Sequence, residues 1–151
     1  MHTPAHYRDL ARACDDGRVL HRLARCPYPF VWHELAANPH TPPEALLELA
    51  AARHSPWNDN RLLHLLAGHP AADRTVLHAV LNATAAKLTQ GRRPYAAAAA
   101  LAGRSELEAD EVRRLGALPG ASARLRTLLH RRLAARGETP PPAPAQASPG
   151  P

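Results

Sequence analysis

One pattern of apolar and polar positions recurs three times along the chain. Residues 20–27, 32–39 and 63–70 each read as a bulky apolar residue, histidine, a variable residue, leucine, alanine, two variable residues and proline. The bulky residue, the leucine and the alanine stand at i, i+3 and i+4, which is one face of a helix. Proline cannot continue the helix and restricts the residue before it, so each helix is predicted to end there. A partial copy at 101–105 lacks the proline.

A second helix is predicted after each proline, and capping residues mark its start. The run TPPE at 41–44 has the form of a capping box, with Thr41 as the N-cap and the glutamate bonding back to it. Asp73 is expected to cap the equivalent helix of the next copy, and Ser105 with Glu108 forms another box. The buried faces of these second helices are expected to consist of Ala45, Leu46, Leu49, Ala50, Val76, Leu77, Val80, Leu81, Val112 and Leu115.

The second and third copies are related by a two-helix repeat of 31 residues. Trp32 corresponds to Leu63, and Leu46 in the following helix corresponds to Leu77. The first and second copies are only twelve residues apart, so a helix is expected to be missing between Pro27 and Trp32. Short helices bury their apolar faces only against neighbours, which is typical of stacked repeats.

Similar signals extend the prediction to the chain ends. Helices are predicted after Pro4, after Pro94, near 106–116 and from 122 to 136. We therefore predict an all-α, right-handed helical-repeat solenoid that forms a single domain over 1–137, followed by a disordered tail over 138–151 that is rich in proline and alanine. Residues that tolerate a left-handed conformation are expected to close three of the helices: Asn38, Gly68 and Gly103.

Residues 37–50, with the sequence ANPHTPPEALLELA, resemble the variant leucine-rich repeat of bacterial proteins. That family is similar in layout to HEAT-type helical arrays. The likeness covers 20–81 well and 95–116 loosely, and it implies helix packing and chain reversal without indicating a function. Some relatives carry a cysteine cluster suited to an iron–sulfur centre ahead of the repeats. Here the only cysteines are Cys14 and Cys26, with eleven residues between them, so we expect no such cluster.

Charge is divided unevenly along the chain, whose formal net charge is +6. Residues 1–86 carry eight arginines and eight acidic residues, whereas residues 87–137 carry eleven basic and four acidic residues, a net charge of +7. Arginine suits phosphate because its planar fork binds two oxygens at once. The chain has eighteen arginines and one lysine, a bias that a GC-rich bacterial genome would also produce.

Other features narrow the class of protein. No apolar run approaches the roughly 18 residues of a membrane helix, so we expect a soluble, cytoplasmic protein. His33 and Glu34 begin like a zinc-protease helix, but residue 37 is alanine and the motif fails. Nothing pairs a nucleophile with a base, and no glycine-rich phosphate loop is present, so we expect neither enzymatic activity nor a cofactor.

Histidines, a tryptophan and arginines are the candidate binding residues. His21, His33 and His64 hold the same place in three copies and are expected to form a line along one flank. Neighbouring helices lie about 8–10 Å apart, which favours positions at helix edges over a shared metal. Trp57 is predicted in a polar loop, where covering the core is favoured over anchoring a partner. The candidate arginines are Arg92, Arg93, Arg113, Arg114, Arg124, Arg126, Arg131 and Arg132.

Two functions from different classes follow from these features. The first is a non-enzymatic adaptor of a bacterial cytoplasm that docks on another protein. The second is a sequence-independent binder of nucleic acid or another polyanion through Arg113, Arg114, Arg124, Arg131 and their neighbours. On a helical wheel of the last helix, Arg124 and Arg131 lie on one side of the apolar arc and Arg126 on the other.

Overall fold

A computed structural model describes residues 3–137, and within that range the chain is helical and has no strand. The fold class is therefore all-α, as predicted. The predicted tail at 138–151 lies outside the described residues. The helices are α1 (Pro4–Ala13), α2 (Gly17–Leu23), α3 (Pro29–Ala37), α4 (Pro43–Ala51), α5 (Pro56–Ala67), α6 (Arg74–Thr89), α7 (Tyr95–Ala102), α8 (Ala109–Arg113) with the 3-10 helix η1 (Arg114–Ala117), and α9 (Ala123–Gly137).

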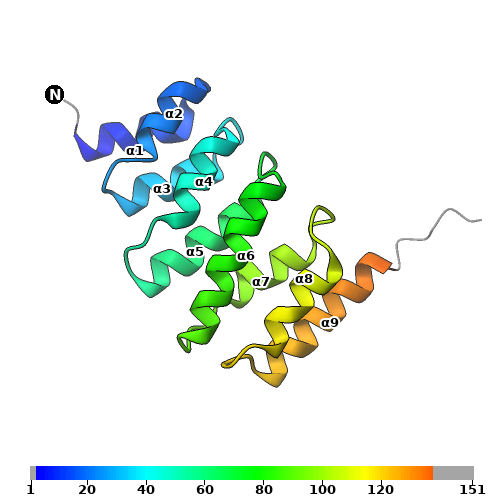
Figure 1. Ribbon diagram of the computed structural model, residues 1–151. Coiled ribbons are helices and arrows are strands. Elements are labelled where there is room, and N and C mark those ends of the chain that lie inside the picture. The colour runs from blue at the N-terminus through cyan, green and yellow to red at the C-terminus, as the bar shows by residue number, and fades with distance from the viewer. Residues whose placement is uncertain (1–2, 138–151) are drawn as a thin grey trace, which may run out of the picture.

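The helices pack in two layers (Figure 1). We call α1, α3, α5, α7 and α9 the odd layer, because each packs against the next in that order. The even layer consists of α2, α4, α6 and α8; α2 packs on α4 and α4 on α6, while α8 packs on α7 and α9. The chain thus advances from α1 at one end to α9 at the other (Figure 1).

The core lies between the two layers and is built mainly from leucine and alanine. All ten residues predicted to form the buried faces of the second helices are buried. Trp32 is also buried, and its indole N–H donates to the carbonyl of Cys26 at 2.8 Å. The 31-residue correspondence holds in space, since α3 and α5 are neighbours in the odd layer and α4 and α6 are neighbours in the even layer.

No separate helix lies between α2 and α3, as expected, but the inference that a helix of the repeat is missing there is wrong. Residues 20–27 belong to α2 in the even layer, whereas 32–39 and 63–70 belong to α3 and α5 in the odd layer. α3 already begins at Pro29, so the layers alternate without a gap. The even-layer helix α2 shares the sequence pattern with α3 and α5, so the pattern does not distinguish the two layers.

Two of the predicted caps are also wrong. Asp73 caps α6 as expected, accepting from the backbone N–H of Val76 at 2.9 Å. Thr41 instead is buried and donates its hydroxyl to the carbonyl of Leu35 at 2.7 Å, because the end of α3 leaves carbonyls without helical partners. Ser105 caps nothing, since α8 begins later and the side chain of Glu111 accepts from the N–H of Glu108.

The helices α3, α5 and α7 do not end in a left-handed residue. Asn38, Gly68 and Gly103 have φ angles of −85°, −97° and −85°. In the odd-layer copies, the residue before the proline, or before Ser105 in the partial copy, instead bonds to the end of the previous odd helix. These equivalent residues are Asn38, His69 and Arg104, which we call the inter-repeat ladder.

Each member of the inter-repeat ladder satisfies carbonyls that a helix end leaves open. Asn38 donates its amide to the carbonyls of Ala11 and Cys14 at 2.9 and 2.8 Å. The ring of His69 meets the carbonyl of Asn38 at 2.8 Å. Arg104 donates to three carbonyls, those of Ala67, His69 and Ala72. The ladder therefore connects α3 to α1, α5 to α3 and α7 to α5.

Candidate functional site

Two adjacent grooves run between the last three helices of the odd layer. The first, of about 230 Å³, lies between α5 and α7, and the second, of about 500 Å³, lies between α7 and α9. Tyr95 lines both, so we treat them as one surface, the odd-layer groove. Its lining is Trp57, Asn60, Arg61, His64, Arg93, Pro94, Tyr95, Ala96, Ala123, Arg124, Thr127, Leu128 and Arg131.

Helical spacing explains why these side chains share a surface. Trp57, Arg61 and His64 stand at i, i+4 and i+7 on α5, which places them on one face. Arg124 and Arg131 are seven residues apart on α9 and also share a face, as the helical wheel predicted. The opposite arc of α9, with Leu125 and Leu129, is buried.

The odd-layer groove is positively charged without compensation. Its lining includes four exposed arginines and no acidic residue. Within residues 3–137 the guanidinium groups of these arginines make neither a hydrogen bond nor an ion pair. Burial lowers the pKa of the neighbouring His33, and the charge of Arg61 lowers that pKa further. The four arginines are Arg61, Arg93, Arg124 and Arg131.

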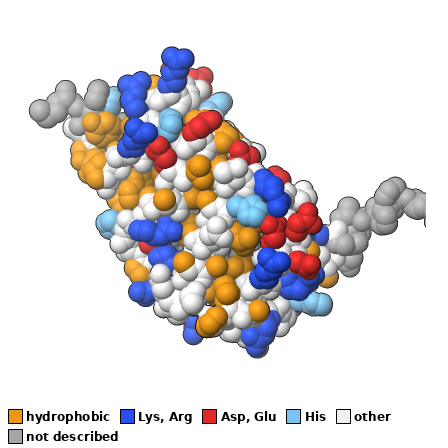
Figure 2. Space-filling model, in the orientation of Figure 1, with side chains coloured by type: hydrophobic (Ala, Val, Ile, Leu, Met, Phe, Trp, Pro, Cys, Tyr) orange, Lys and Arg blue, Asp and Glu red, His pale blue; other side chains and the backbone are white. Residues whose placement is uncertain are grey.

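Basic side chains of the even layer are often paired instead. Glu48 accepts from Arg25 at 3.0 Å and contacts His21 at 3.1 Å. Glu111 lies 3.2 Å from Arg74 and 3.0 Å from His78. In Figure 2, acidic and basic side chains lie interleaved near α8.

Two aromatic residues stand among the groove arginines. Trp57 belongs to α5 and exposes 69% of its surface, so the predictions that it lies in a loop and covers the core are both wrong. Its ring meets the ring of His33 edge-on, with centroids 6.2 Å apart. Tyr95 is half-buried, and its hydroxyl lies 2.7 Å from the hydroxyl of Ser122, which holds the ring between the two parts of the groove.

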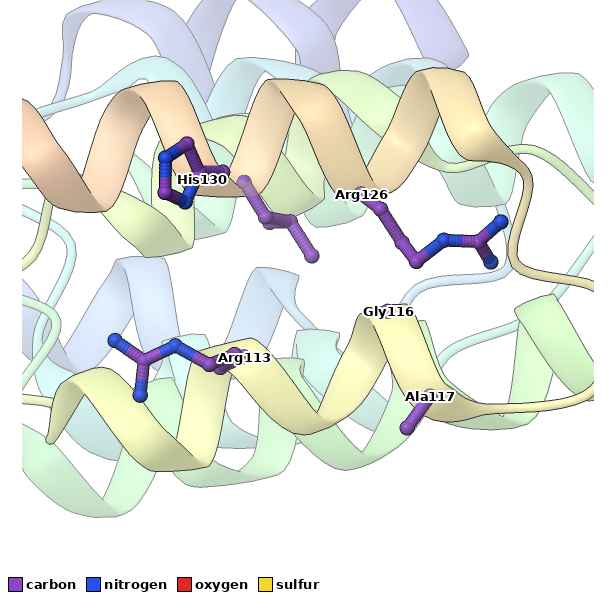
Figure 3. A pocket seen from close by; sticks show the side chains of 6 residues that line it. Arg113, Gly116, Ala117, Arg126 and His130 are labelled. Carbon is purple, nitrogen blue, oxygen red and sulfur yellow. The ribbon is translucent and has the colours of Figure 1, made fainter.

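Arg113 and Arg126 lie elsewhere, in a separate groove of about 440 Å³ between η1 and α9 (Figure 3). Arg113 is paired with Asp110, and Arg126 donates to the carbonyl of Ala121. In Figure 3 the two guanidinium groups extend toward opposite ends of the groove. The structure therefore does not bring Arg113 and Arg126 together with Arg124 and Arg131.

The remaining predicted arginines occupy other places. Arg114 lines a small groove between α6 and α8 together with Glu111. Arg92 and Arg132 are exposed and line none of the grooves described here.

The line of three histidines is a wrong prediction. His21 lies on α2 in the even layer, where it contacts Glu48. Only His33 and His64 are equivalent, and each ring meets a backbone carbonyl of the next odd helix, that of Asn58 and that of Ala96, both at 3.3 Å. Among the described residues, no three metal-ligating side chains gather in one place.

The lysine counted in the basic half is internal. Lys87 is buried and forms an ion pair with Asp59 at 2.8 Å.

Sequence reasoning missed Arg61, because it belongs to the half that is neutral overall. The available signal was local: Arg61 follows Trp57 by four residues, the spacing that makes side chains neighbours on a helix.

Comparison with family models gives no match, and neither the curated proteins nor the solved structures include a significant match to this chain. Among the helices of residues 3–137, none has the length and apolar character needed to cross a membrane.

Proposed function

We propose that this protein binds an anionic phosphate polymer, such as nucleic acid, in the odd-layer groove. The observation that carries this proposal is the set of four exposed arginines without partners in a lining that has no acidic residue. Arginines placed in this way contact phosphates and release the counterions bound to the polymer. Counterion release contributes a large part of the free energy of such binding.

We further propose that the two layers form a short right-handed solenoid of the variant leucine-rich-repeat or HEAT-like kind. The inter-repeat ladder supports this, because Asn38, His69 and Arg104 repeat one type of contact between successive odd helices. In such an array a ligand groove is a surface that crosses several repeats, as the odd-layer groove crosses α5, α7 and α9.

A binding titration with two matched charge-reversal variants tests the proposed function. Arg61→Glu/Arg124→Glu is expected to weaken binding of a fluorescent 20-nucleotide DNA by at least about tenfold, because two phosphate contacts become repulsive. The control is Arg18→Glu/Arg132→Glu, which changes net charge equally at exposed sites outside the groove. Fluorescence anisotropy at about 50 mM salt gives both dissociation constants.

Salt dependence adds a second readout. For a single strand held by four phosphate contacts, a plot of the logarithm of the association constant against the logarithm of the salt concentration should have a slope of about −3. Equal weakening by the groove and control variants, or no binding at low salt, would contradict the proposed function.

Docking on another protein remains the second candidate, and an apolar groove at the α1 end favours it. That groove, of about 510 Å³, is lined mainly by Tyr7, Leu10, Val19, Leu23 and Tyr28. Phe30 stacks on Tyr28 and exposes 41% of its surface, and Figure 2 shows hydrophobic side chains gathered over α1. Binding of a partner to this groove should persist at moderate salt and should be lost in the Phe30→Asp variant. If the Phe30→Asp variant still retains the partner, this surface is not the docking site.

A further inference from the structure

We infer that the odd-layer groove selects single-stranded nucleic acid, with Trp57 and Tyr95 stacking on bases and the four arginines contacting phosphates. This inference rests on the proposed function and names the ligand class of the same site. It is carried by the arrangement of aromatic and basic side chains along the groove.

Trp57 is exposed at the α5 side of the odd-layer groove. Its indole contributes little to the core, in contrast to the buried Trp32. A large aromatic surface left in solvent gains free energy when a ligand covers it. Nucleic-acid bases are suited to this role, since every base has a flat face that stacks on an aromatic ring regardless of sequence.

Basic and aromatic side chains follow one another across the odd-layer groove. From α5 to α9 the groove presents Trp57 with Arg61, then Arg93 with Tyr95, then Arg124 with Arg131. Arg61 comes from α5, Arg93 from the loop before α7, and Arg124 and Arg131 from α9. Neighbouring packed helices lie about 8–10 Å apart, so the groove extends about 16–20 Å across the three helices. An extended strand of a few nucleotides covers that length with its phosphates near arginines and its bases near the rings.

A duplex fits this arrangement less well. Its bases are stacked on one another and present only their edges in the grooves, so the rings of Trp57 and Tyr95 find no base face. A duplex or a simple polyanion would use the arginines alone. Single strands should therefore bind more tightly than either, and the difference should depend on Trp57.

The test compares three labelled probes on the full chain: a 12-nucleotide oligothymidine, a 12-base-pair duplex and long-chain polyphosphate. The wild type is expected to bind the single strand at least about fivefold more tightly than the duplex. Trp57→Ala is expected to weaken single-strand binding roughly tenfold, the usual effect of losing one stacked base, while polyphosphate binding stays within about twofold. Trp57→Phe keeps a ring and should recover part of the loss.

Phe30→Ala is the matched control, since it removes an exposed aromatic ring outside the odd-layer groove. It should leave all three affinities unchanged. The single-strand inference is overturned if Trp57→Ala weakens all probes equally or none of them, or if duplex and single strand bind alike. In those cases Arg61→Glu/Arg124→Glu would still weaken every probe, and the proposed function would stand. No binding of any probe by the wild type would overturn both.

Discussion

At the scale of single residues, Lys87 and Asp59 form an ion pair that is almost completely removed from solvent, with 7% and 4% of their surfaces exposed. Asp59 also accepts the backbone N–H of His54 at 2.8 Å. The mutual attraction of such a pair offsets the cost of removing both charges from water, but a single charge left behind is strongly destabilising. Because Lys87 lies in the last turn of α6, the pair connects that turn to α5. It therefore stabilises the position of the helix that carries Trp57 and Arg61.

Asp59→Ala is expected to lower the free energy of unfolding by about 3–5 kcal/mol, because it leaves the Lys87 ammonium buried without a partner. The double variant Asp59→Leu/Lys87→Met replaces both charges with apolar groups and should recover most of that loss. Urea denaturation followed by circular dichroism measures both. A loss below about 1 kcal/mol in the single variant would show that water reaches the pair.

Two glycines with positive φ angles provide a test of local packing. Gly91 has φ of +80° and open space around its α-carbon, whereas Gly120 has φ of +91° and a methyl group there would overlap the carbonyl oxygen of Leu88. Gly91→Ala is expected to cost about 1–2 kcal/mol, the penalty of the left-handed conformation alone. Gly120→Ala adds overpacking and should cost about 2–5 kcal/mol. Thermal unfolding compares them, and equal costs would contradict the close approach of Gly120 to α6.

At the scale of helices, the inter-repeat ladder makes the stacking sensitive to pH through His69. Its Nε2 donates to the carbonyl of Asn38, and its Nδ1 accepts from the N–H of Ala71 at 2.9 Å, so both nitrogens are used in the neutral ring. Burial lowers the pKa of His69, and the charge of Arg104 lowers it further, while the bond to Asn38 opposes the shift. The folded protein therefore resists protonation at this position.

The free energy of unfolding is expected to fall as the pH drops below about 6.5, because the unfolded chain takes up a proton there that folded His69 does not. The lowered pKa of His33 acts in the same direction. His69→Asn keeps a donor at this position but cannot titrate. Urea denaturation at pH 7.5 and 5.5 should show a smaller loss in this variant than in the wild type. An equal loss in both would rule out His69 as a source of the pH dependence.

The helices themselves were predictable where short-range signals act alone. Proline position and i, i+3, i+4 spacing predicted the ends of α3 and α5 and the buried faces of α4 and α6. The first copy of the pattern was misassigned because α2, an even-layer helix, ends with the same residues as the odd-layer helices. Thr41 was misassigned because its hydroxyl bonds to an acceptor six residues earlier, at the end of another helix.

The candidate site was predictable only in part. The wheel of α9 placed Arg124 and Arg131 together and Arg126 apart, as observed. Arg61 could not be assigned from the charge of each half, because the groove joins helices from both sides of that division. Which helices meet depends on the alternation of the layers, and no local pattern in the sequence contains that information.

At the scale of the whole molecule, the odd-layer groove brings four arginines without guanidinium partners and two aromatic rings together across the last three odd helices. The opposite groove beside η1 holds an arginine that Asp110 already neutralises, and Glu48 and Glu111 pair with basic residues of the even layer. The net charge of +6 is therefore less informative than its placement. We expect the ligand to contact α5, α7 and α9 and to leave the α1 end free.

Chemical-shift mapping by NMR tests this central claim most directly. The chain has two tryptophans and therefore two indole N–H signals. One belongs to the exposed Trp57, and the other to Trp32, whose indole N–H donates a hydrogen bond to the carbonyl of Cys26. On titration with a 12-nucleotide single strand, the Trp57 indole and the amides near Arg61, Tyr95 and Arg124 are expected to shift, while the Trp32 indole stays in place. Shifts confined to the groove of Arg113 and Arg126, or to the α1 end, would contradict the account.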